Sequence, residues 1–342
     1  QNSMEAVGGS FLISLILFII VAFFHNERIN SKKRLLVILE YNEKGLKRLD
    51  NTWKEFSDIG EEFIDRNHKF SSDLDIFGKN SLFQWINLTK TTFGRKKLAS
   101  KMIMNSLPTR YEIEEEQEAI KELANKREFC EKIYFEASIE SKKKEKLKEL
   151  LDWASNEEKN NFTVKYISYI FIAITCIILF LTIIGRLSIS YLILDLVINY
   201  LVIKLFTKKL SDVIDIFINN KREIEKYSKL LSIIQDENFQ SKKLLDIQKD
   251  LVSSNINCKN EMKKLKNIIS WLGDSTSNAY YLLINVFFMS DIFILSNLQE
   301  WRITNGYKLE KWLEDMGEVE ALVSLSTISF EHEEWTYPTI SG

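Results

Sequence analysis

The pattern of apolar and polar positions begins with a long uncharged run. Residues Ala6 to Phe24 carry no charge, and about 20 consecutive apolar residues are enough to cross a bilayer. Basic residues follow this run instead of preceding it, an order that favours an uncleaved anchor over a signal peptide. These basic residues are Arg28, Lys32, Lys33 and Arg34. The pattern predicts a transmembrane anchor over residues 1–30, with its N-terminus outside the cell.

A second apolar region has two halves, Tyr166–Ile184 and Leu187–Phe206, joined by Gly185 and Arg186. Each half is long enough to span a membrane. Lysines flank both outer ends of the pair, so the positive-inside rule places those ends in the cytoplasm. The sequence therefore predicts a transmembrane hairpin over residues 161–207, and three spans in all.

Polar residues interrupt the second half of this hairpin. Asp195 lies near its middle, with Tyr191 and Asn199 one helical turn to either side, so the three share a helix face. An ionisable residue at this depth marks either a functional site or a polar seam between helices. We prefer the seam, because the apolar region offers no second buried charge for a transport relay.

The remaining segments follow a helical pattern. Residues 31–70 place apolar residues at helical spacing, which predicts an amphipathic stalk. Apolar residues recur at three-to-seven spacing over 208–275 and predict two long antiparallel lever helices. The segment Tyr280–Leu298 is apolar but interrupted by polar residues and without basic flanks, so we expect a buried helix of the soluble part.

Local signals predict where three further helices begin. Ser81 and Thr109 each open a capping box, which predicts helices from near Leu82 and Tyr111. Thr92 is expected to cap a third helix. The chain has 342 residues, only two prolines and eleven glycines, and this scarcity of turn-forming residues favours long helices. The predicted fold class is all-α.

Candidate chemistry is sparse. The three cysteines and three histidines are scattered, so the sequence suggests neither a disulfide framework nor a metal site. No phosphate-binding loop, dinucleotide fingerprint, zinc-protease motif or nucleophile elbow occurs. The sequence therefore gives no catalytic residue and no cofactor site, and leaves open whether the protein is an enzyme.

A cluster of cations stands where the helix macrodipole disfavours positive charge. It consists of Arg95, Lys96, Lys97 and Lys101. These side chains could pair with the acidic stretch Glu114–Glu118 or contact phosphate; we prefer pairing, because a wider basic surface with interleaved aromatics is missing. Lys263 and Lys264 offer a second possible phosphate contact, although a solvated helix face is the more common role of such lysines.

The segment from Ser81 to Ala124 resembles the start of the core domain in the MutS mismatch-repair family. That family has a short Leu-Phe helix, Thr-x-Thr-x-x-Gly-Arg-x-x-Leu, a proline, and a helix bearing Arg-Gln-x-Ala-x-x-x-Leu. The matching residues are Leu82, Phe83, Thr89, Thr91, Gly94, Arg95, Leu98, Pro108, Gln117, Ala119 and Leu123. Residue 116 departs from the pattern, because the usual arginine is Glu116 here.

The segment from Leu309 to Ile340 resembles the region that joins this core to the family's ATPase domain. The residues that carry the likeness are Trp312, Gly317, Glu320, Ala321, Leu322, Ser324, Leu325, Trp335 and Pro338. The resemblance implies a MutS-like helical core in two halves, 71–160 and 276–342, with the hairpin inserted between them. Within the family, the chain most resembles the membrane-anchored bacterial branch. This resemblance implies that the protein is located in the bacterial cytoplasmic membrane.

The resemblance also implies function. We expect the chain to be the core and lever of a longer ATPase whose ATPase domain follows Pro338, binds ATP and Mg²⁺ and forms a homodimer. DNA contact is possible by this likeness, but mismatch recognition is not expected, because no segment resembles the mismatch-reading domain. The alternative is a self-contained helical membrane scaffold that binds a protein partner.

Overall fold

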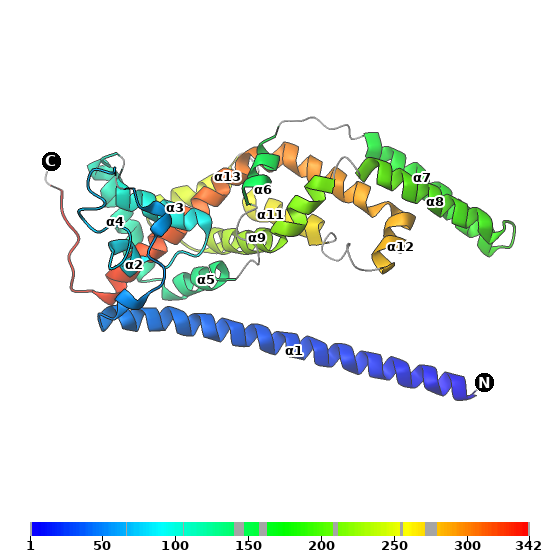
Figure 1. Ribbon diagram of the computed structural model, residues 1–342, viewed down its shortest axis with the longest axis horizontal. Coiled ribbons are helices and arrows are strands. Elements are labelled where there is room, and N and C mark those ends of the chain that lie inside the picture. The colour runs from blue at the N-terminus through cyan, green and yellow to red at the C-terminus, as the bar shows by residue number, and fades with distance from the viewer. Residues whose placement is uncertain are drawn as a thin grey trace.

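The computed structural model describes residues 2–65, 67–104, 106–139, 147–156, 163–207, 211–253, 256–270 and 279–340. Over these residues the protein is almost entirely helical, with one two-stranded antiparallel ribbon. This confirms the predicted all-α class. The molecule is elongated, and the N-terminal end of the first helix lies at the same end as the turn of the hairpin (Figure 1).

The first helix, α1 (Asn2–Leu49), joins the predicted anchor and stalk without a break. The predicted stalk is too long, because the helix ends at Leu49 and Asn51 then adopts a left-handed backbone conformation (φ 59°). Short 3₁₀ turns η1 (Trp53–Glu55) and η2 (Glu61–Phe63) follow. The side chains of residues 1–13, 15, 16, 19 and 30 lie outside the described residues, so the first span stays a prediction.

Five helices form the first half of the core. They are α2 (Leu82–Ile86), α3 (Thr92–Ile103), α4 (Arg110–Ala124), α5 (Arg127–Ala137) and α6 (Leu147–Ser155). Thr109 and Glu112 complete the predicted capping box of α4. The predicted cap of α3 is wrong by one residue: the Thr91 hydroxyl accepts the N–H of Gly94, and Thr92 is already helical.

The hairpin consists of α7 (Thr163–Ile183) and α8 (Ile189–Thr207). Both helices are long and apolar enough to cross a membrane. Only 11% of the apolar stretch in α7 and 17% of that in α8 is buried against protein. Most of their surface is therefore left for lipid, as expected of a membrane protein.

The region predicted to form two long lever helices is more divided. It contains α9 (Ser211–Asp236), α10 (Lys242–Leu251), the strands β1 (Val252–Ser253) and β2 (Ile256–Asn257), and α11 (Cys258–Ser270). Lys259 at the start of α11 bonds Asp236 at the end of α9, while Lys221 bonds the carbonyl of Ser270. The antiparallel pair is thus α9 with α11, and the ribbon interrupts the second predicted helix.

The apolar segment Tyr280–Leu298 is not one buried helix of the soluble part. It is divided between α12 (Ala279–Phe288) and α13 (Ser290–Glu331), which meet at an angle of 74°. Met289 at the break has a left-handed backbone (φ 50°). Together the two helices are long and apolar enough to form one bent span, and α12 packs against α8 of the hairpin.

The longest helix of the core is α13, with 42 residues. Near its start it packs against α7 and α8, and further along against α6, α11, α9, α4, α3 and α2 (Figure 1). Its buried positions include Trp312, Leu313 and Met316 in the main hydrophobic core. One continuous helix thus connects the membrane hairpin with the far end of the molecule.

Candidate functional site

The two sequence segments that resemble the MutS family pack against each other through a buried carboxylate. Glu320 of α13 accepts the backbone N–H groups of Lys90 and Thr91 and the hydroxyl of Thr91. Burial raises the pKa of Glu320, although these hydrogen bonds act in the opposite direction. Because Thr91 also caps α3, this contact, the Glu320 clasp, fixes the start of α3 to α13.

Two glycines permit the close approach of α3 and α13. A Cβ atom at Gly94 would lie 2.2 Å from Oε2 of Glu320, and one at Gly317 would lie 2.6 Å from the backbone of Phe93. Real Cβ atoms are not found at such distances. Gly94 and Glu320, which the resemblance selected independently, are therefore parts of one packing arrangement.

The extended segment after α13 is held to the same core. The side-chain amide of Gln117 donates to the carbonyl of Pro338 (3.1 Å), and the indole of Trp335 lies 6.1 Å from that of Trp85. Thr89 is buried and bonds the side chain of Asn87. Pro108 is the exception, since it is exposed in the loop before α4.

The cation cluster is mostly paired with carboxylates from other elements. Arg95 bonds Asp58 and Glu62, and Lys97 lies 3.6 Å from Glu314. Lys96 is exposed and has no ionic partner within the described ranges. Of the acidic residues on α4 that were expected to pair with this cluster, only Glu116 does so, and its partner is Lys101.

Lys101 lies in the last turn of α3, where the helix macrodipole favours positive charge, so the expectation that it stands at the start of a helix is wrong. Its ammonium group lies 2.7 Å from Glu116 and 2.7 Å from Glu318. Burial alone would lower the pKa of Lys101, but the two carboxylates raise it. Glu116 is the position at which the chain departs from the family pattern, so the departure supplies a partner for Lys101.

The other candidate phosphate contacts lie on an open surface. Lys263 and Lys264 are both exposed on α11, and Lys264 pairs with Glu261 one turn earlier. Together with Asn257, Asn260 and Asn267 they line a shallow depression. The depression contains a carboxylate as well as the two lysines, so its charge is mixed.

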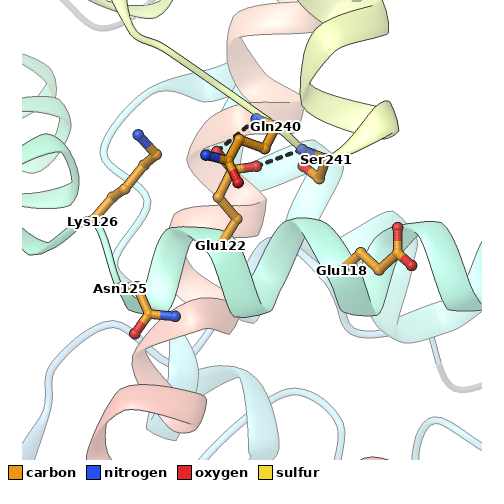
Figure 2. Close-up of a pocket in the computed structure, with 6 residues that line it drawn as sticks. All are labelled: Glu118, Glu122, Asn125, Lys126, Gln240 and Ser241. Atoms are coloured by element: carbon orange, nitrogen blue, oxygen red, sulfur yellow. Dashed lines mark hydrogen bonds between the residues drawn. The ribbon is translucent and has the colours of Figure 1, made fainter.

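A second shallow groove, of about 450 Å³, lies between α4 and the loop before α10. In this groove the carboxylate of Glu122 accepts the backbone N–H groups of Gln240 (2.9 Å) and Ser241 (2.7 Å) (Figure 2). Lys126 turns to the loop itself and bonds Glu237 and the carbonyl of Asn238. Glu122 and Lys126 thus hold the loop in place, and we interpret the groove as a structural contact between α4 and this loop.

A buried ion pair joins the C-terminal ends of α1 and α13. Arg48 donates from Nε and Nη2 to the two carboxylate oxygens of Glu331, at 2.7 and 2.6 Å. The two side chains are only 2% and 6% exposed. The neighbouring guanidinium of Arg127 stacks 3.8 Å from the ring of Phe330. Sequence reasoning missed this junction, because its partners lie 283 residues apart.

The hairpin contains a polar network near the middle of its two apolar helices. The Thr175 hydroxyl of α7 donates to Oδ2 of Asp195 (2.7 Å), and Nδ2 of Asn199 donates to the Thr175 hydroxyl (2.8 Å). Asp195 and Asn199 are therefore together, as the predicted seam requires. Tyr191 is not part of it, because its side chain is 57% exposed.

Thr175 was missed as a member of this network, although the sequence held a signal. Ser168 and Thr175 are seven residues apart in an apolar run, a spacing that places them on one helix face, and both are buried.

Within the described ranges no group of three or more His, Cys, Asp or Glu side chains could hold a metal ion. The comparisons with known proteins found no matching family model, no matching curated protein and no matching solved structure.

Proposed function

We propose that this chain is the membrane-anchored core and lever of a MutS-related ATPase. The observation that carries the proposal is α13, a single 42-residue helix that contacts the hairpin at one end and the Glu320 clasp near the other. A helix resists compression along its axis because every turn is hydrogen-bonded. Displacement at one end of α13 therefore reaches the other end.

The Glu320 clasp and the Gln117–Pro338 bond support the family part of the proposal. Both contacts join residues that the sequence resemblance selected, one from each matched segment. In the proposed mechanism an ATPase domain, expected after Pro338 by resemblance, would bind ATP and Mg²⁺. Its movement would pull on the extended segment and on α13, and would reach the membrane through α7, α8 and α12.

The first test is the reading frame of the source gene beyond codon 342. A phosphate-binding loop downstream is expected. The full-length protein, with its native cysteines replaced, would then carry spin labels at two exposed positions, Leu107 before α4 and Tyr307 on α13. ATP is expected to change the distance between these labels, because α13 is the element that moves in the proposed mechanism. A matched pair at Tyr307 and Phe330, both on α13, should keep its distance.

A stop codon at this point, or equal Leu107–Tyr307 distances with and without ATP, would refute the lever proposal. The alternative, a membrane scaffold that binds a protein partner, is favoured by a different observation. Leu35, Leu39, Leu46 and Leu49 form a stripe on α1, and all four are exposed. Exposed apolar stripes of this kind commonly mark interaction surfaces. A stable complex lost on replacing these leucines by serine would support the scaffold.

A further inference from the structure

The polar network of the hairpin continues into a third helix. Asn199 of α8 donates not only to Thr175 but also to the backbone carbonyl of Val286 in α12 (3.3 Å). The four polar groups of Asp195, Thr175, Asn199 and Val286 thus come from three helices. Such convergence is costly in a membrane unless the groups satisfy one another or a ligand.

These groups lie deep within the predicted span. Thr175 is about two turns, roughly 12 Å, from the Ile183 end of α7, and Asn199 is equally far from the Thr207 end of α8. The hydrocarbon core of a bilayer is about 30 Å thick. Lys165 marks the cytoplasmic boundary, because it lies 3.6 Å from Glu300 and 3.2 Å from the side chain of Asn297.

The third helix ends where it meets the network. Since α12 ends at Phe288 and turns by 74° into α13, the carbonyl of Val286 is among the last four of its helix and lacks the usual i+4 partner. The negative end of the α12 dipole is therefore directed at this point. The break is braced by Asn285, which accepts the N–H of Asp291 (3.0 Å) and donates to its carboxylate (2.6 Å).

One buried polar atom of the network is left without a partner. Asn199 is 0% exposed, and its Oδ1 has no hydrogen-bond partner among the described residues. Its amide orientation follows from the neighbours, since the carbonyl of Val286 can only accept a hydrogen bond and must face Nδ2. A polar seam alone would explain the bonds between the helices, but it would leave this oxygen unsatisfied.

We propose that Asp195, Thr175, Asn199 and the Val286 carbonyl form a binding site for a monovalent metal cation of sodium size. Interrupted membrane helices whose free carbonyls and C-terminal ends face a buried carboxylate are suited to such ions. Oxygen ligands of this kind prefer hard cations. When the ion binds, the Asn199 amide turns so that Oδ1 joins the carboxylate, hydroxyl and carbonyl oxygens.

The charge count selects the class of ion. Asp195 is the only carboxylate in the sequences of α7, α8 and α12, and Asp291 at the start of α13 is already bonded to Asn285. One negative charge is neutralised by one positive charge, whereas a divalent ion would leave a net charge buried in a medium of low dielectric. A proton is the competing occupant, because it also neutralises Asp195.

The test uses the purified full chain in lipid vesicles and an apolar carbodiimide, which labels protonated carboxyl groups in apolar surroundings. The label on Asp195 is read by peptide mass spectrometry while sodium chloride replaces choline chloride at constant ionic strength and pH. We expect the labelling rate to fall about tenfold when sodium reaches about ten times its dissociation constant. Labelling unaffected by sodium, or absent without it, would overturn the proposal.

Two variants in α7 make the test specific. Thr175→Val removes a proposed ligand, so protection should require at least about tenfold more sodium. Thr182→Val is the matched control, because the Thr182 hydroxyl bonds the carbonyl of Ile178 within its own helix (2.8 Å); sodium should protect it like the wild type. Equal protection in both variants would contradict the proposed ligand set. If Thr175→Val fails to fold, the wild-type titration still decides.

Discussion

Replacing Arg48 by methionine should destabilise the helical core strongly. The substitution keeps most of the side-chain volume but leaves the Glu331 carboxylate, 6% exposed, without its cation and without two hydrogen bonds of 2.7 and 2.6 Å. Removing one partner of a buried ion pair typically costs about 3–5 kcal/mol. We therefore expect the free energy of unfolding to fall by about that amount.

A double-mutant cycle separates this pairing from simple loss of packing. Replacing both partners, with Arg48→Met and Glu331→Leu, removes the uncompensated charge, and such replacements are often close to neutral. The double variant should thus be more stable than Arg48→Met alone by about 2 kcal/mol or more. Lys47→Met is the matched control on the same turn: its pair with Glu55 is exposed, and exposed pairs contribute about 0–1 kcal/mol.

The measurement is pulse proteolysis across a urea series, on protein purified in a mild detergent. It reports the unfolded fraction of the helical core outside the hairpin. If Arg48→Met costs no more than Lys47→Met, the junction between α1 and α13 does not depend on the buried pair, and the reasoning is refuted.

Three further predictions follow from other contacts. Gly94→Ala should cost about 2 kcal/mol or more in the same assay, because its Cβ would overlap Glu320 at 2.2 Å; no measurable loss would contradict the clasp. In maleimide labelling of the folded protein at pH 8, Cys130 should stay unlabelled, because it is buried and burial raises its pKa to about 11. Cys176, which is exposed on α7, should react with an apolar maleimide but not with a charged one. Rapid labelling of Cys176 by the charged reagent would contradict a membrane-embedded α7. Burial lowers the pKa of Lys44 to about 8, against about 10.4 unfolded. Between these pH values Lys44 binds more protons in the unfolded state than in the folded state. As the pH rises from 8 to 10, the free energy of unfolding of the wild type should therefore increase by about 1 kcal/mol or more relative to that of Lys44→Met. A stability difference between the two proteins that stays constant across pH 8–10 would contradict this prediction.

Features encoded by neighbouring residues could be predicted from the sequence. The capping box at Thr109 needs only Glu112, three residues later, and the hairpin follows from two apolar runs around Gly185. The end of α1 could not be predicted in this way. The apolar periodicity continues past Leu49, and the chain leaves the helix because Phe63 packs against Phe77 and Phe83 in a separate cluster.

The sites depend on contacts that no local pattern reports. The resemblance selected Thr91, Gly94 and Glu320 as separate positions, but their common role appears only when α3 and α13 meet. Asp195 was evident as a charge in an apolar run, whereas the contact of its neighbour Asn199 with α12 was not. That contact depends on the turn at Met289, and no glycine or proline marks the turn in the sequence.

The length of α13 also limits how this protein can vary. Its 42 residues extend about 63 Å, with the hairpin contacts near its start and Glu320 beyond its middle. One extra residue between these points would rotate everything after it by about 100° and turn Glu320 away from Thr91. Seven extra residues would restore the orientation to within about 20°. Related chains are therefore free to lengthen this helix by whole heptads, and any single-residue change must be matched by a compensating one before Glu320.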